Sequence, residues 1–144
     1  MIGAIAMGMS ALGHLASAPL LRLRVPVWIV IAVAFSAYAA AVIGIFSGGL
    51  SAAPVAVLAC MALAIGGLAP GAFYSAAPQV APTAESLPTT IGLFQQASNL
   101  GQFAGPIAVG ACIEHLGWMW EPIVAVPVAL AGIGLAFAIR RSPL

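Results

Sequence analysis

The stretch that decides the fold is Val27–Phe46, VWIVIAVAFSAYAAAVIGIF, in which Ser36 and Tyr38 are the only polar side chains. An α-helix needs about 20 predominantly apolar residues to cross the hydrocarbon core of a bilayer, and this stretch supplies that length. A helix that is apolar on every side is surrounded by lipid or protein rather than by water. The sequence therefore predicts a membrane-spanning helix here.

The composition of the whole chain agrees with a membrane protein. Hydrophobic residues make up 63% of it and charged residues 5%, whereas a soluble domain is about 25% charged. A formal net charge of +1 and the absence of a basic patch exclude a nucleic-acid-binding surface. The charged residues are Arg22, Arg24, Glu85, Glu114, Glu121, Arg140 and Arg141.

These charges divide the chain into uncharged runs. The run from 25 to 84 would make a helix of roughly 90 Å at about 1.5 Å per residue, so it must fold back once. The turn-forming cluster Ser47–Ser51 marks the reversal. A β-barrel does not fit, because the runs are long and lack strict alternation. Five spans result, at about 1–21, 25–46, 52–76, 87–112 and 120–140, with a loop over Ala77–Leu87.

The sequence thus predicts an all-α, polytopic membrane helix bundle, with residues 1–144 as one membrane domain and no soluble domain. The positive-inside rule predicts its orientation. Arg22 and Arg24 follow the first span, and Arg140 and Arg141 follow the fifth, so both pairs fall on one side. We expect this loop and the C-terminus to be cytoplasmic, with Glu114, His115 and Glu121 solvated at the opposite interface.

The same topology predicts an external N-terminus, which an upstream helix would explain. We therefore expect this chain to be the tail of a longer polytopic protein or a truncated reading frame. A removable signal peptide is a weaker interpretation, because no Lys or Arg precedes Arg22 although Ala16-Ser17-Ala18 resembles a cleavage site.

The most polar span is the fourth. It contains Gln95-Gln96-Ala97-Ser98-Asn99-Leu100-Gly101-Gln102-Phe103-Ala104-Gly105-Pro106. Polar groups are costly in hydrocarbon unless they face a partner helix or a water-filled cavity. The amides Gln95, Asn99 and Gln102 share one helical face. We predict either that they line a substrate cavity or that they bond neighbouring helices together.

A second face of this span carries small residues, Ala97, Gly101 and Gly105. The GxxxG spacing of the two glycines permits close packing against another helix, and Pro106 follows them directly. In the third span Pro70 should kink the helix and is a candidate hinge. Tyr74, one turn later, and His14 in the first span are further cavity candidates.

Nothing in the sequence indicates an enzyme, a cofactor or a metal site. Gly8-Met9-Ser10 and His115 could suggest the catalytic residues of an intramembrane protease, but we expect them to lie at different depths in the membrane. Cys60 and Cys112 lie within spans and lack metal-ligand spacing, so packing residues are the expected role.

Two segments resemble each other, Ser10–Ser17 and Ser98–Gly105, with Ser, Leu, Gly and Ala in register. The spans that carry them are three apart and so run in opposite directions. Inverted three-helix repeats of this kind occur in secondary transporters. In a chain this rich in Ala, Gly and Leu, chance similarity is the alternative.

Residues from Pro82 to Trp118 resemble the loop, eleventh helix and following turn of a major facilitator superfamily transporter. Ser98–Pro106 and Gly117-Trp118 carry the resemblance. Gly13-His14-Leu15-Ala16 with Arg22 and Arg24 is similar to that family's cytoplasmic loop motif, although Ser17 stands where the motif has an acid.

The resemblance implies that the five spans correspond to helices eight to twelve of that family. It implies that spans one, three and four line the central cavity, with spans two and five peripheral. The expected function is that of the C-terminal part of a secondary active transporter for small molecules in the cell (inner) membrane. Such a part would not transport alone, because the N-terminal half or another membrane protein must complete it.

The alternative is a small membrane protein that binds other helices through Gly101 and Gly105. A small dimeric multidrug exporter fits less well, because such proteins carry a membrane-embedded carboxylate early in the chain and this sequence has none there.

Overall fold

The computed structural model describes residues 2–141 of the chain, and the side chains of residues 8–140. All regular secondary structure in this part is helical, which confirms the predicted all-α fold class. The elements are α1 (Ile2–Arg22), α2 (Val27–Phe46), α3 (Ala52–Gly66), α4 (Leu68–Val80), η1 (Ala84–Ser86), α5 (Leu87–Leu116), η2 (Trp118–Trp120) and α6 (Pro122–Arg141).

Three of the helical stretches are long and apolar enough to cross a membrane. They are Val27–Phe46, Ala52–Val80 and Trp118–Arg140, and they identify the chain as a membrane protein. The helices α1 and α5 are not among them. α5 has ample length at 30 residues, but its amides and threonines make it less apolar. That all five stretches cross the bilayer therefore stays a prediction.

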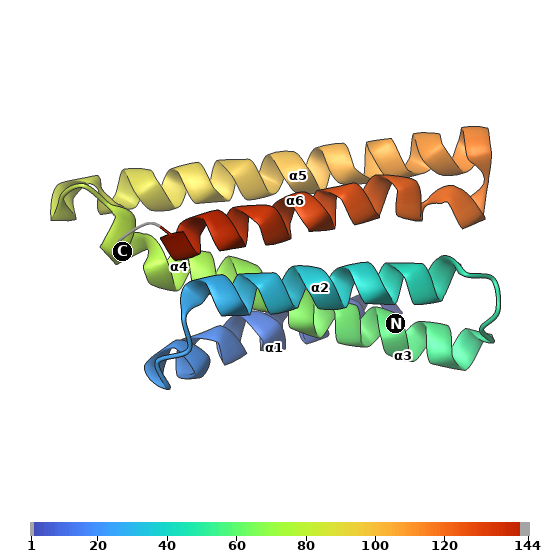
Figure 1. Ribbon diagram of the computed structural model, residues 1–144, viewed down its shortest axis with the longest axis horizontal. Coiled ribbons are helices and arrows are strands. Elements are labelled where there is room, and N and C mark those ends of the chain that lie inside the picture. Colours follow the sequence, from blue (N-terminus) through green and yellow to red (C-terminus); the bar gives the residue numbers. More distant parts are fainter. Residues whose placement is uncertain (1, 142–144) are drawn as a thin grey trace.

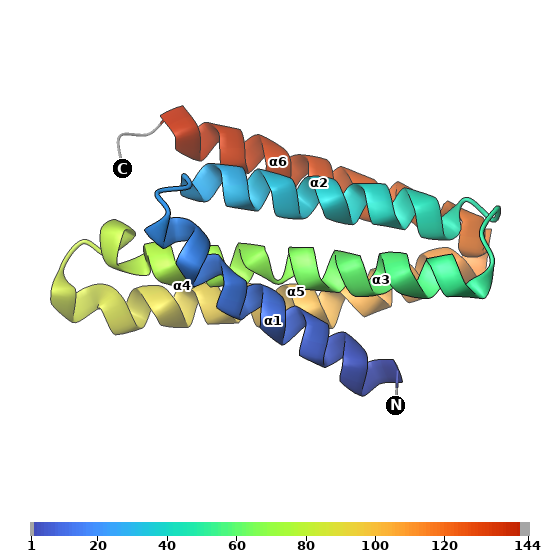
Figure 2. The ribbon, with the colours of Figure 1, turned by 90° about the horizontal axis from the view of Figure 1, so that it is seen from below.

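The helices lie side by side with their connections gathered at two ends (Figures 1 and 2). One end holds the α1–α2 turn, the α4–α5 connection and the last turn of α6, and with them Arg22, Arg24 and Arg140. We call this the arginine end. The opposite end holds the α2–α3 turn and η2, next to Glu114 and Glu121, and we call it the η2 end.

The chain reverses between α2 and α3 within Ser47–Ser51, as the sequence predicts, and Gly48 takes a φ of 74° there. The connection to α5 is shorter than the predicted loop Ala77–Leu87, because α4 continues to Val80. A capping box then starts η1: the Ser86 backbone N–H donates to Thr83 Oγ1 at 3.2 Å, and the Thr83 N–H donates to Ser86 Oγ at 3.0 Å.

The third span is broken at Gly67, which separates α3 from α4. Pro70 is the third residue of α4 and has no backbone N–H to offer the preceding turn. The next N–H, that of Gly71, reaches the Gly67 carbonyl only at 3.5 Å. The interruption expected from Pro70 thus occurs one turn before it. Pro106, by contrast, lies inside α5 without ending that helix.

Helix α1 crosses α3 and α4 at very short range. A Cβ atom added to Gly13 would overlap the Ala64 carbonyl, and one added to Gly67 would overlap the Ser10 carbonyl. At Gly71 it would meet the Ser17 hydroxyl, which itself donates to the His14 carbonyl at 2.7 Å. The crossing is therefore a backbone-to-backbone contact that only glycine permits at these positions.

Helix α2 is the hub of the bundle, because it packs on α3, α4 and α6. Val30 and Ile31 form a buried cluster with Ala72 of α4 and Ala136 of α6. Aromatic contacts of two tryptophans lie at the two ends of α2. Trp28 packs on Phe137 with ring centroids 5.6 Å apart and lies 5.1 Å from the Arg140 guanidinium. At the η2 end Phe46 stacks on Trp118 at 5.7 Å.

The glycine crossing gives a first prediction. Gly13→Ala should lower the midpoint of thermal unfolding in detergent micelles, because the new methyl group pushes α1 away from Ala64 at a cost of about 1–3 kcal/mol. Loss of helical circular dichroism measures the midpoint. Gly8→Ala is the matched control on the same helix, because nothing lies within 4 Å of its added Cβ. Equal midpoints for the two variants would contradict this account of the crossing.

Candidate functional site

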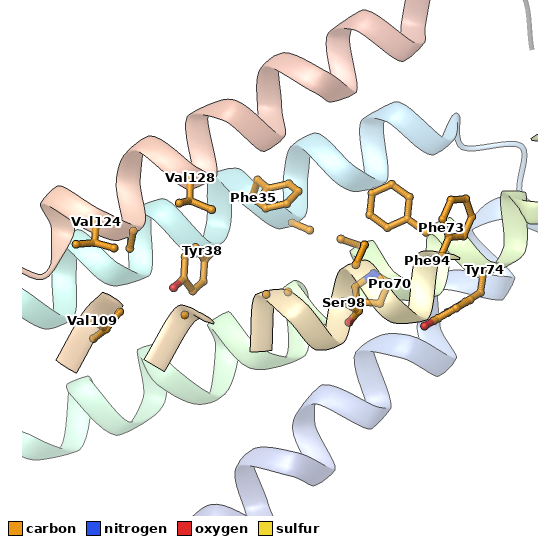
Figure 3. Close-up of a pocket in the computed structure, with 17 residues that line it drawn as sticks. Phe35, Tyr38, Pro70, Phe73, Tyr74, Phe94, Ser98, Val109, Val124 and Val128 are labelled. Carbon is orange, nitrogen blue, oxygen red and sulfur yellow. The ribbon is translucent and has the colours of Figure 1, made fainter. Parts of the chain in front are cut away.

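A pocket of about 580 Å³ lies between α2, the α3–α4 span, α5 and α6. Its size is in the range of small-molecule sites, about 300–1,000 Å³. Figure 3 shows its side chains converging from these helices. The lining residues are Ala34, Phe35, Tyr38, Gly66, Ala69, Pro70, Phe73, Tyr74, Phe94, Ala97, Ser98, Gly101, Gly105, Val109, Val124, Ala125 and Val128.

The pocket has an aromatic part and an aliphatic part. Phe73 and Phe94 lie with their ring centroids 6.0 Å apart, next to Tyr74 (Figure 3). Valines from α5 and α6 line the part nearer the η2 end, where Tyr38 extends from α2 (Figure 3). The polar side chains in the lining are the hydroxyls of Tyr38, Tyr74 and Ser98. An apolar wall with a few placed hydroxyls suits a mainly apolar small molecule.

The small residues of α5 create this space. Ala97, Gly101 and Gly105 face the pocket, and a Cβ atom added to either glycine would have nothing within 4 Å. The sequence predicts that this ladder packs closely against a neighbouring helix. In the part of the chain that the structure describes, it faces the pocket, and close glycine packing occurs instead in α1 at Gly13.

A hydrogen-bonded chain leaves the pocket along α5. The Tyr74 hydroxyl donates to Gln95 Oε1 at 2.6 Å, and Gln95 Nε2 donates to Asn99 Oδ1 at 2.9 Å. Next to it, Gln102 Nε2 donates to the Ser98 hydroxyl at 3.1 Å. Two pocket residues, Tyr74 and Ser98, are therefore tied to the amides that the sequence singles out.

The amides themselves do not line the pocket. Gln95, Asn99 and Gln102 are exposed, although Tyr74 of α4 reaches Gln95 at the edge of their face. Leu100 and Phe103, also on the uncovered part of α5, are 67% and 72% exposed. The face is thus mixed, with amides next to large apolar side chains. Tyr74 is the one predicted cavity residue that does line the pocket.

His14 lies apart from the pocket, on α1. Its Nδ1 lies 2.8 Å from the Ser10 carbonyl oxygen, which accepts a hydrogen bond from it. The resemblance implies that the first span lines the cavity and that spans two and five are peripheral. The pocket instead takes residues from α2 and α6, and none from residues 8–22 of α1, the part of that helix whose side chains are described. Helices α1 and α5 do run in opposite directions, as an inverted repeat requires (Figure 2).

Several pocket residues come from spans that read as uniformly apolar. Phe35 and Tyr38 of α2 and Val124 and Val128 of α6 are examples. On α2 the signal was Tyr38 alone, because Ser36, two residues earlier, lies on another face of the helix and does not line the pocket. The valines of α6 carry no such signal.

One sequence-based expectation needs correction. Glu121 was expected to be a solvated interfacial charge, but its side chain is 3% exposed, and in the part of the chain that the structure describes its Oε2 atom has no hydrogen-bond partner. Glu121 joins η2 to α6: its backbone N–H donates to the Trp118 carbonyl and its carbonyl accepts from the Val124 N–H, so it belongs to a hydrogen-bonded turn and not to a solvated loop.

Among the side chains of residues 8–140, no three His, Cys, Asp or Glu residues lie close enough together to bind a metal ion. Cys60 and Cys112 are both free thiols. The Cys112 thiol is buried and donates to the Trp120 carbonyl at 3.4 Å, which fastens η2 to α5. This is a structural role.

Comparison with protein-family models finds no match for this chain, and comparisons with curated proteins and with solved structures find none either.

The Tyr74–Gln95 bond gives a second prediction. In a double-mutant cycle of Tyr74→Phe and Gln95→Ala, unfolding in detergent should show a coupling energy of about 0.6 kcal/mol, the usual size of an interhelical hydrogen bond in a membrane protein. The same cycle with Tyr38→Phe in place of Tyr74→Phe should show none. A zero coupling for Tyr74 would mean that α5 is not held to α4 through this bond.

Proposed function

We propose that this chain forms the C-terminal part of a secondary active transporter for small molecules, of the major facilitator type, in the cell (inner) membrane. The observation that carries the proposal is the pocket of about 580 Å³ lined by α2, the α3–α4 span, α5 and α6. Transporters of this kind bind their substrate between helices near the middle of the bilayer. The pocket is apolar enough for a small organic molecule and has hydroxyls to orient it.

The exposed amides of α5 support the proposal that a second bundle of helices packs against this chain. Alternating access requires two bundles that rock about a central site. Gln95, Asn99 and Gln102 lie on the surface of this chain, where lipid would leave part of their hydrogen-bonding capacity unused. A second bundle with polar groups would use it. The chain by itself therefore binds substrate but does not transport it.

The alternative, a helix-binding protein that uses Gly101 and Gly105, has less support. Those two glycines line the pocket, and a Cβ atom added to either has nothing within 4 Å, so no described helix packs on them. Gly101 is exposed and Gly105 half-buried, so a partner helix seated there would cover the open side of the pocket. The aromatic side chains and hydroxyls of the lining fit a small molecule better than a helix.

A third prediction tests the pocket with naphthylethanol, a neutral aromatic alcohol, as the probe. Calorimetry on the chain in lipid nanodiscs, with empty nanodiscs subtracted, should detect saturable binding. Gly101→Leu should weaken it by about tenfold, because the new side chain occupies the pocket. Gly110→Leu is the matched control: it lies on α5, has nothing within 4 Å of its added Cβ, and is not a lining residue.

Equal binding to both variants, or none to the native chain, would overturn the pocket as a binding site. In proteoliposomes the chain alone should give no saturable uptake of the probe. Saturable uptake would overturn the claim that a second bundle is needed.

A fourth prediction concerns orientation, which we propose places the arginine end in the cytoplasm. Ser47 is exposed in the α2–α3 turn and Thr83 is exposed between α4 and η1, at opposite ends. With Cys60 and Cys112 replaced by alanine, a membrane-impermeant maleimide should label Ser47→Cys in intact cells. Thr83→Cys should react only after permeabilisation, and the reverse pattern would show the opposite orientation.

A further inference from the structure

A second hollow lies on the side of α2 that faces away from the pocket. It is a groove of about 540 Å³, and in the part of the chain that the structure describes its lining belongs to α2: Trp28, Ile29, Ala32, Val33, Ser36 and Ala37. These positions form one strip along the helix, whereas Ala34, Phe35 and Tyr38, which line the pocket, fall on the opposite face. Val33 is 50% exposed, so the groove opens to the outside of the bundle.

The length and depth of the groove match one leaflet of a bilayer. From Trp28 to Ala37 it runs roughly 14 Å at about 1.5 Å per residue, and half of the hydrocarbon core is about 15 Å thick. Val27 begins and Arg140 ends two of the stretches that are long and apolar enough to cross a membrane. Trp28 therefore lies at the boundary of the hydrocarbon, where tryptophan rings are enriched, and the groove leads from there toward the middle of the bilayer.

The boundary end of the groove is positively charged. The Arg140 guanidinium is exposed and lies 5.1 Å from the centre of the Trp28 ring, which lines the groove. A guanidinium can donate two parallel hydrogen bonds to a phosphate. Pro26, the residue before α2, has no side-chain acceptor for the first N–H groups of that helix, and these groups also favour an anion.

We propose that this groove binds an anionic phospholipid of the surrounding leaflet, with the phosphate at Arg140 and one acyl chain along α2 toward Ala37. This inference goes beyond the proposed function and does not depend on it. A free anion would leave the apolar groove empty. A zwitterionic lipid would bring its own positive group toward Arg140, so the anionic lipid is favoured.

The probe is phosphatidylglycerol that is brominated on its acyl chain near the headgroup, which quenches a tryptophan on contact. With Trp118 and Trp120 replaced by phenylalanine, the fluorescence reports on Trp28. In phosphatidylcholine vesicles, the association constant of a minor share of this lipid at Trp28 should be about fivefold that of brominated phosphatidylcholine. This ratio corresponds to about 1 kcal/mol for one basic residue at the membrane surface. Both leaflets have the same composition, so the orientation of the chain does not affect the result.

Matched variants separate this site from general attraction to the arginine end. Arg140→Gln should bring the ratio to about one and keep the quenching by brominated phosphatidylcholine, which shows that Trp28 is still in place. Arg22→Gln, an exposed arginine that closes α1 at the same end, should keep the ratio. Ser36→Leu should lower the ratio, because the new side chain fills the groove. Ala131→Leu, at an exposed position of α6 outside the groove, should not.

Three results would overturn the proposal. A ratio of one in the native chain would show that the groove does not select an anionic lipid. Equal losses for Arg22→Gln and Arg140→Gln would show that the lipid is attracted by the whole arginine end, without a site at Trp28. An unchanged ratio in Ser36→Leu would show that no acyl chain lies along α2. Each result is independent of whether naphthylethanol binds in the pocket.

Discussion

Close approach of small residues holds this bundle together. In lipid the hydrophobic effect does not drive helices toward one another, so packing and interhelical hydrogen bonds must do so. Glycines at 13, 67 and 71 let the backbone of α1 touch that of α3 and α4. The buried positions of α2, α4 and α6 are mostly alanines, among them Ala34, Ala72 and Ala136. Most contacts between the helices are therefore made by small residues, with Val30, Ile31 and Val42 of α2 as the larger side chains buried among them.

The pocket also results from small residues, at a place where no neighbouring helix packs against them. Where two helices both present small residues and meet, as α1 and α3 do, no space remains. On α5 the small residues Ala97, Gly101 and Gly105 meet no opposing backbone in the described chain, so they leave a hollow. Phe73 and Phe94 keep α4 and α5 apart at one end of it. The Tyr74–Gln95 hydrogen bond fixes their relative position.

The sequence predicted the helices well and their faces less well. Charge spacing and the turn residues at Ser47–Ser51 located the five long helical stretches, because their extent depends on local length and polarity, whereas η1, η2 and the break at Gly67 were not predicted. The identity of the inner face could not be predicted for α2 and α6, because a helix that is apolar all round has no periodic signal. For α5 the sequence left open whether the amides line a cavity or bond a neighbouring helix. Gln95 accepts a hydrogen bond from Tyr74 of α4, and the small residues of the other face line the pocket. Glu121 was misplaced because burial at a turn depends on the path of η2, which the sequence pattern does not contain.

The gathering of the arginines at one end has a consequence for assembly. Arg22 and Arg24 close α1, and Arg140 lies near the end of α6 (Figure 1), so both ends of the described chain give the insertion machinery the same instruction. In the orientation that we propose, every copy would enter the membrane in one direction, without dual topology. Two copies would then meet only as parallel neighbours, about an axis along the membrane normal. The two halves of a major facilitator transporter are related in this way, so on the proposed function the partner that covers the amides of α5 would be parallel to this bundle.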